Sequence, residues 1–102
     1  MTAKYQIIYW RDIPTQVKVR SATARVTREL SARFQQVIDA AAMSSGVTGT
    51  DDYLSNWRTS EWHPAEGPPE SVADDIIAKL EDDYPPQRLS ELARRGGHAS
   101  TE

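Results

Sequence analysis

Tryptophan and arginine are the residue types of this chain with the clearest capacity for molecular recognition. Three tryptophans occur in 102 residues, and Trp10 and Trp57 are each followed directly by an arginine. Trp and Arg dominate the energetic hot spots of protein interfaces, and an indole beside a guanidinium can also stack on a planar anion. We therefore predict a partner-binding surface built from these two residue types. The candidate contact residues are Trp10, Arg11, Arg20, Arg25, Arg28, Trp57, Arg58 and Trp62.

Residues suited to catalysis or metal binding are sparse. The chain has no cysteine, and its two histidines, His63 and His98, do not follow the spacing of zinc ligands. Glu61 and His63 are two residues apart, as an acid–base pair on one side of a strand would be, although a solvated rim is the simpler interpretation. Glycine-rich phosphate loops and nucleophile elbows are missing. We expect no catalytic residue, metal or cofactor, and an enzyme using Glu61, His63 and nearby arginines remains a competing hypothesis.

Charge is distributed unevenly along a chain whose net charge is −3. Residues 1–36 hold seven basic and two acidic groups, a net charge of +5, whereas residues 37–102 hold five basic and thirteen acidic groups, a net charge of −8. The two halves could pack with complementary charge, or each could simply solvate its own surface. Alternatively, the first third forms a basic face for an anionic partner.

The hydrophobic pattern predicts one small α+β domain, because 102 residues are too few for two independent cores. Residues 16–20 alternate between apolar and polar side chains and pair with 5–10 as an antiparallel hairpin. Val26, Leu30, Phe34 and Ile38 recur at helical spacing, which predicts a long helix that packs across the sheet. The expected elements are strands at 5–10, 16–20 and 58–63, and helices at 22–43, at about 50–57, at 70–83 and at 87–95. We expect residues 1–95 to form the domain and residues 96–102 to be a disordered tail.

The chain contains no apolar run long enough to cross a membrane, and no apolar leader precedes the first strand. We therefore expect a cytoplasmic protein without a membrane partner.

Several blocks of residues carry a resemblance to a known family. They are Tyr5-Gln-Ile-Ile-Tyr-Trp-Arg-Asp-Ile-Pro14, Gln16-Val-Lys-Val-Arg20, Leu30-Ser-Ala-Arg-Phe-Gln35, Ala40-Ala-Ala-Met43, Gly49-Thr-Asp-Asp-Tyr-Leu54 and Trp57. In this combination the chain resembles the small bacterial proteins grouped as the "virulence factor" family, from about residue 4 to residue 84. The resemblance implies an accessory role beside enzymes of folate- and corrinoid-linked methyl transfer. It supplies no catalytic residue.

Three kinds of partner remain open at this point. The first is another protein or a second copy of the chain, bound by a non-catalytic accessory module. The second is a small planar or anionic ligand, such as a pterin, stacked on tryptophan and held by arginine. The third is single-stranded nucleic acid, which uses the same side chains but which the net negative charge disfavours.

Overall fold

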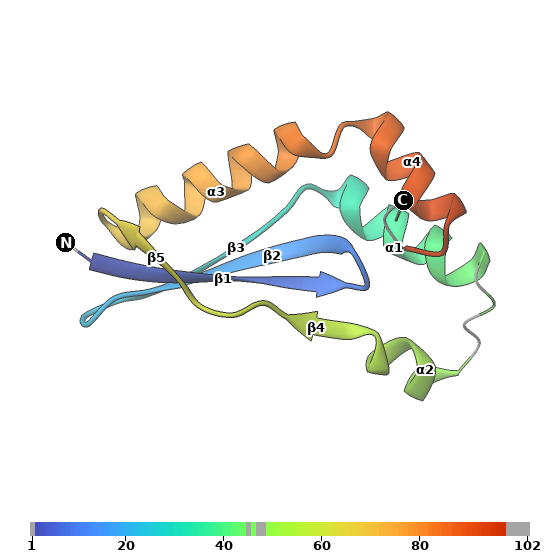
Figure 1. The fold of residues 1–102 in the computed structure, drawn as a ribbon, viewed down its shortest axis with the longest axis horizontal. Coiled ribbons are helices and arrows are strands. Elements are labelled where there is room, and N and C mark those ends of the chain that lie inside the picture. The colour runs from blue at the N-terminus through green and yellow to red at the C-terminus, as the bar shows by residue number, and fades with distance from the viewer. Residues whose placement is uncertain (1, 45, 47–48, 98–102) are drawn as a thin grey trace.

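The computed structural model describes residues 2–44, 46 and 49–97, apart from the side chains of residues 50 and 52. The fold is α+β, as expected from the sequence: an antiparallel sheet with helices on one face and at one end (Figure 1). No helix among these residues has the length and apolar character needed to span a bilayer. The elements in chain order are β1 (Thr2–Trp10), β2 (Ile13–Arg20), β3 (Arg25–Glu29), α1 (Ala32–Ser44), α2 (Thr50–Ser55), β4 (Trp57–Thr59), β5 (His63–Glu66), α3 (Pro69–Asp83) and α4 (Pro86–Arg94).

The β1–β2 hairpin forms the centre of the sheet, which confirms the predicted N-terminal hairpin. β2 pairs with β3 on one side, and β1 pairs with both β4 and β5 on the other. The register shifts between Ile8 and Tyr9, so that Tyr9 lies opposite Pro14. Pro14 cannot donate a ladder hydrogen bond, and an irregularity at this point accommodates it.

The long helix predicted over residues 22–43 is wrong in its first half. Residues 25–29 form β3, and α1 begins only at Ala32. A tight turn starts β3, since the Ser21 amide donates to the Ala24 carbonyl at 2.8 Å, and β-branched Val26 then lies opposite Val19. Val26 fitted a helical stripe with Leu30 equally well. Pairing with an exposed edge of β2 decided between the two structures, because local propensity is a weak guide where tertiary partners exist.

The strand predicted over residues 58–63 is present only at its two ends, because β4 ends at Thr59 and β5 begins at His63, both along the same edge of β1. Between them the chain leaves the ladder, and the Ser60 hydroxyl accepts the Ile7 amide hydrogen bond at 2.9 Å. The Ser60 amide donates to the Ile7 carbonyl at the same distance. The backbone amide and carbonyl of Ile7 therefore keep hydrogen-bond partners across the break between β4 and β5. Trp62 lies in this break and is not part of a strand.

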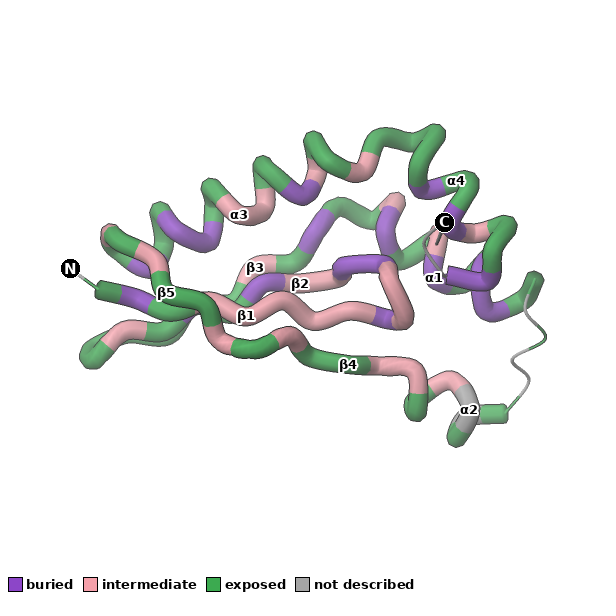
Figure 2. Tube along the Cα trace, in the orientation of Figure 1, coloured by how far each residue is buried: buried purple, intermediate pink, exposed green. Residues whose placement is uncertain are grey.

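The helix that covers the sheet is α3, whereas the sequence suggested the first helix. α3 packs on β1, β2 and β3 (Figure 1), with Val72, Ala73 and Leu80 buried against the face that carries Val17 and Val19. α1 packs mainly on α4 at one end of the sheet. Figure 2 shows the buried positions of α3 facing the strands and its outer positions exposed. The core is therefore continuous from the sheet into the α1–α4 end of the molecule.

Gly96 and Gly97 belong to this packed end and not to a free tail. The Gly97 amide donates to the Leu92 carbonyl at 2.7 Å, and its carbonyl accepts from the Asp12 amide at 2.9 Å. Both glycines are buried. The remainder of the predicted tail, residues 98–102, lies outside the described residues.

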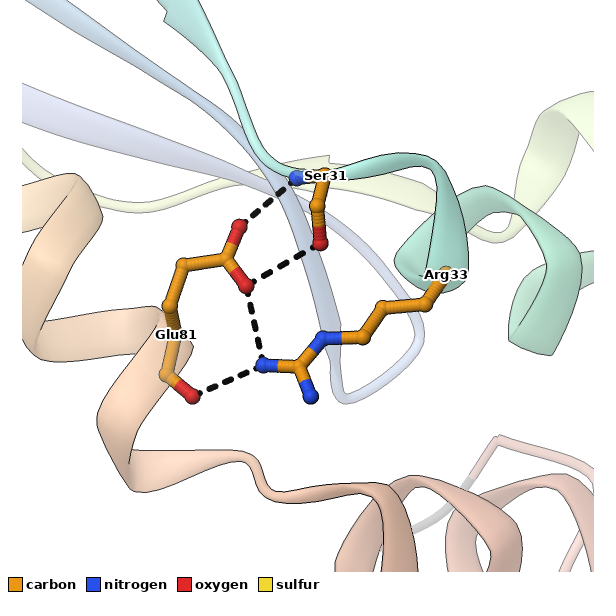
Figure 3. Close-up of polar contacts among 3 residues, drawn as sticks. All are labelled: Ser31, Arg33 and Glu81. Carbon is orange, nitrogen blue, oxygen red and sulfur yellow. Dashed lines mark hydrogen bonds and ion pairs between the residues drawn. The ribbon is translucent and has the colours of Figure 1, made fainter.

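Glu81 joins α3 to the start of α1 (Figure 3). Its carboxylate accepts hydrogen bonds from the Ser31 amide at 2.7 Å, the Ser31 hydroxyl at 3.0 Å and the Arg33 guanidinium at 2.9 Å. Burial alone would raise the pKa of Glu81, but the hydrogen bonds from Ser31 and Arg33 outweigh it and lower the pKa below its usual 4.5. The ionised carboxylate also lies beside the N-terminus of α1, where negative charge is stabilising.

We expect Glu81→Gln to lower the free energy of unfolding at neutral pH by about 1–2 kcal/mol, because hydrogen bonds to a charged group are lost. A carboxyl whose pKa is lowered in the folded state stabilises above its unfolded pKa and loses that contribution as the pH falls. The difference between Glu81→Gln and wild type should therefore shrink as the pH drops below 4.5. Urea denaturation across this range measures it, with the exposed Asp82→Asn as the control; a pH-independent difference would contradict the account.

Candidate functional site

Trp10 lies inside the protein and is not available to a partner. Its side chain is 0% exposed. The indole N–H donates to the Tyr53 carbonyl at 2.9 Å, and the two rings lie 5.7 Å apart. The Arg11 guanidinium covers the indole at 4.8 Å. The structure thus removes Trp10 from the predicted contact surface and makes it a core residue.

Arg11 and Arg58 are also occupied within the chain. Arg11 donates from Nε to the Asn56 side chain at 3.1 Å and from Nη1 to the Gly96 carbonyl. Arg58 donates to the Arg11 carbonyl at 2.8 Å and forms an ion pair with Asp12 at 3.1 Å. The Trp-Arg pairs of the sequence therefore fasten the β1–β2 turn to β4 and to the C-terminal end. A partner would have to compete with these contacts.

Arg28 and Trp57 have structural partners as well. Arg28 reaches across from β3 to Asp74 on α3, with 3.4 Å between Nε and Oδ1. Both side chains are well exposed, so the pair contributes little to stability. Trp57 lies opposite Trp10 in the ladder and packs edge-on against Tyr53 at 6.0 Å, half-buried. Neither residue lies with the remaining candidates, Arg20, Arg25 and Trp62.

Arg20, Arg25 and Trp62 come together on the face of the sheet opposite α3. The strand register lines up Lys4, Arg20 and Arg25 directly across β1, β2 and β3. Side chains that are directly opposite point to the same face and have Cβ atoms about 5 Å apart. All three residues are exposed. We call them the cationic row.

The next position along the same face adds a second tier of polar side chains. Lys18 lies opposite Gln6 on β1 and opposite Thr27 on β3. A hollow of about 300 Å³ opens over these residues. Its side-chain lining comes from Gln6, Lys18, Arg20, Arg25, Thr27 and Trp62.

Trp62 reaches this hollow because it lies in the break between β4 and β5. The Arg20 guanidinium stacks over its indole at 4.2 Å, and the ring is half-buried. The contact bridges from the β1 edge of the sheet to β2. It fixes the direction of the Arg20 side chain without neutralising its charge, because a cation over an aromatic ring stays charged.

The electrostatics of the cationic row are unbalanced. Among the described residues, no carboxylate forms an ion pair with Lys4, Lys18, Arg20 or Arg25. Like charges directly opposite across a sheet destabilise it. Because no described carboxylate offsets these charges, the row is a concentrated positive surface on a chain that is acidic overall.

Lys4 and Lys18 were absent from the sequence-based candidates. Lys18 could have been found, because the alternation of residues 16–20 already places it on the same face as Arg20. Finding Lys4 required the hairpin register. Arg25 was among the candidates, but only the pairing of β3 with β2 places it beside Arg20. The structure gives no support for Glu61 and His63 as an acid–base pair. The His63 ring lies 5.3 Å from the Tyr5 ring, and no contact between Glu61 and His63 occurs among the described residues.

A family model described as virulence factor matches residues 8–93, which is most of the chain. The chain belongs to the virulence factor family. No curated protein and no solved structure matches it. In this family member, Arg20, Arg25 and Trp62 lie within the matched region, and Lys4 lies just before it. The family description states no reaction, so the chemistry has to come from the site.

Proposed function

We propose that this virulence factor family member is a binding module that docks an acidic segment of a partner protein on the open face of its sheet. The observation that carries the proposal is the cationic row of Lys4, Arg20 and Arg25, which lies across three strands without a described ion pair. Lys18 extends the row, and Trp62 flanks it.

The row is distinctive because it aligns three cations across neighbouring strands, whereas other arginines without a described ion pair, such as Arg88 on α4, lie outside it. Arg28, Arg33 and Arg58 each face a carboxylate, at 3.4, 2.9 and 3.1 Å. Thirteen acidic groups follow residue 36, so carboxylates are plentiful. The register places Glu66 opposite Thr2 on the same face as the row, but among the described residues neither it nor another carboxylate forms an ion pair with the row. An acidic partner would convert the repulsion within the row into attraction, and such complementarity favours encounter and specificity.

The shape of the surface favours a protein segment over a small molecule. Apart from Trp62, the side chains that point into this hollow are polar or charged, so it has no aliphatic wall against which the body of a small molecule could pack. Neighbouring strands lie about 4.8 Å apart, so the row spreads its charges over roughly 10 Å. An extended chain with several carboxylates can contact all of them at once.

Nucleic acid fits the surface less well. Binding of single strands relies on free aromatic faces for stacking, and one face of Trp62 is already covered by Arg20. The net charge of −3 also opposes a polyanion as long as a nucleic acid. If the partner is an enzyme of methyl transfer, as the sequence resemblance implies, the acidic segment belongs to that enzyme.

A matched pair of charge variants tests the proposal. Arg20→Gln/Arg25→Gln removes two charges from the row, and Arg94→Gln/Arg95→Gln removes two from exposed positions at the end of α4. Figure 1 shows α4 at the opposite end of the molecule from the turn between β2 and β3. We expect the first variant to bind a fluorescein-labelled oligoglutamate peptide about tenfold more weakly, and the second to bind like wild type.

Fluorescence anisotropy at low and high salt measures these affinities, because exposed charge pairs weaken as salt rises. A labelled single-stranded oligonucleotide serves as the competing probe. Equal losses in the two variants would show that only net charge matters. Tighter binding of the oligonucleotide would replace the proposed acidic protein segment with nucleic acid.

A further inference from the structure

A second hollow lies between α3 and the covered face of the sheet, on the opposite side from the cationic row. Its volume is about 290 Å³. Tyr5, Ile7 and Tyr9 alternate along β1 and therefore point to the same face. The rest of the lining comes from Ile76, Lys79, Leu80, Asp83, Tyr84 and Arg88.

The lining combines apolar walls with a group of tyrosine hydroxyls. Ile7, Ile76 and Leu80 supply aliphatic surface. Three of the four tyrosines of the chain line this hollow, and within the described structure their hydroxyls have no hydrogen-bond partner. The fourth, Tyr53, lies elsewhere and its hydroxyl contacts Gln35 at 3.5 Å. None of these hydroxyls is a buried atom without a partner, so they are open to solvent and can donate to a ligand bound in the hollow.

Burial raises the pKa of Tyr9, and the neighbouring Tyr84 raises it further. Burial likewise raises the pKa of Tyr84. Both phenols therefore stay protonated at neutral pH and can donate a hydrogen bond. A ligand that accepts hydrogen bonds suits this lining better than one that only donates them.

Cations surround the hollow in excess of acids. Arg88 stacks on Tyr84 at 4.3 Å and uses Nη1 for the Asp83 carbonyl, and its other guanidinium nitrogens have no described acceptor. Lys79 is exposed and has no ion pair among the described residues. Arg58 covers Tyr9 at 4.5 Å, and its charge is balanced by Asp12. Among the described residues of the lining, Asp83 is the one carboxylate.

We propose that this hollow binds a small amphipathic carboxylate, with its apolar or aromatic body against Ile7, Ile76 and Leu80. The carboxylate lies at the rim, where Lys79 and Arg88 provide charge and the tyrosine hydroxyls donate hydrogen bonds. The small volume limits the ligand to a single ring or a short acyl chain. This site is independent of the docking face, because no residue lines both hollows.

The test titrates ¹⁵N-labelled protein with benzoate, octanoate and the neutral analogue benzyl alcohol. We expect amide shifts at β1 and α3 with the two carboxylates, and binding of benzyl alcohol about tenfold weaker because the charged contacts are lost. Lys79→Gln should weaken benzoate binding about fivefold, and Tyr9→Phe should weaken it by removing a donor. Lys18→Gln makes the same charge change on the docking face and should leave benzoate binding unchanged.

Three results would overturn the proposal. The first is equal binding of benzoate and benzyl alcohol, and the second is that the shifts are confined to other parts of the molecule. The third is an equal loss of benzoate affinity in Lys79→Gln and Lys18→Gln. The variants Arg20→Gln/Arg25→Gln and Lys79→Gln change different hollows, so any of these results leaves the proposed function standing, and failure of the docking face leaves this site standing.

Discussion

Trp10→Ala is expected to lower the free energy of unfolding by about 3–5 kcal/mol, which is the usual range for removing a buried tryptophan. Trp10 is 0% exposed, and its indole contacts Tyr53, Gly97 and the Arg11 guanidinium. Truncation leaves a cavity and deprives the Tyr53 carbonyl of its donor. Since the total free energy of unfolding of a small domain is only about 5–15 kcal/mol, the variant should be close to unfolding.

Trp62→Ala is the matched control, because it removes the same side chain from a half-buried position. Its loss should be smaller, about 1–2 kcal/mol, because only part of the ring surface is buried and a cation–π contact with Arg20 is lost. Urea denaturation followed by far-ultraviolet circular dichroism compares the two variants. Similar stabilities would contradict the assignment of Trp10 to the core. The comparison also matters for binding experiments, since loss of a partner in Trp10→Ala would report unfolding and not a lost contact.

Gly97→Ala is expected to lower the free energy of unfolding by about 2–4 kcal/mol, because two costs combine. Gly97 has a φ of +92°, in the region that L-residues with a Cβ rarely adopt. A Cβ there would also lie 3.0 Å from the Trp10 ring and 3.2 Å from Arg11 Cδ. The Trp10 ring is enclosed and cannot move aside cheaply.

Two other glycines separate these costs. Gly46 has a φ of +74° with open space around it, so Gly46→Ala should show the backbone cost alone, about 1 kcal/mol. Gly49 has a φ of −107° and equally open surroundings, so Gly49→Ala should be near neutral. Thermal or urea unfolding of the three variants gives the ranking. If Gly97→Ala were no worse than Gly46→Ala, the packing of residue 97 on Trp10 would be refuted.

The sequence was sufficient for the elements whose pattern admits one interpretation. The alternation of residues 16–20 predicted β2, and the helix expected at 70–83 is α3; both are confirmed. The helix prediction for residues 25–29 was wrong, because Val26 fits a helical stripe and a strand alternation equally well. The choice depended on whether the edge of β2 was free, which is a property of the assembled sheet.

The sequence named Arg20, Arg25 and Trp62 as candidates for the site, but it did not name Lys4 or Lys18 and did not show which candidates lie together. The excess of basic residues before residue 37 indicated a positive surface. The adjacent Trp-Arg pairs led to Trp10 and Arg11 as candidates, but Trp10 is buried and Arg11 is hydrogen-bonded within the chain. Lys4, Arg20 and Arg25 show no local pattern, because only strand pairing brings them into line. Trp62 depended on the break between β4 and β5.

The measurement that most directly tests the docking claim is the footprint of an acidic peptide on the protein. Amide and side-chain chemical shifts would be followed while unlabelled oligoglutamate is added to the ¹⁵N-labelled protein. The account predicts that the largest changes fall on Lys4, Lys18, Arg20, Arg25 and the Trp62 indole, and that they fade as salt is raised. Changes centred on α1, α4 or the hollow beneath α3, or no changes at all, would contradict it.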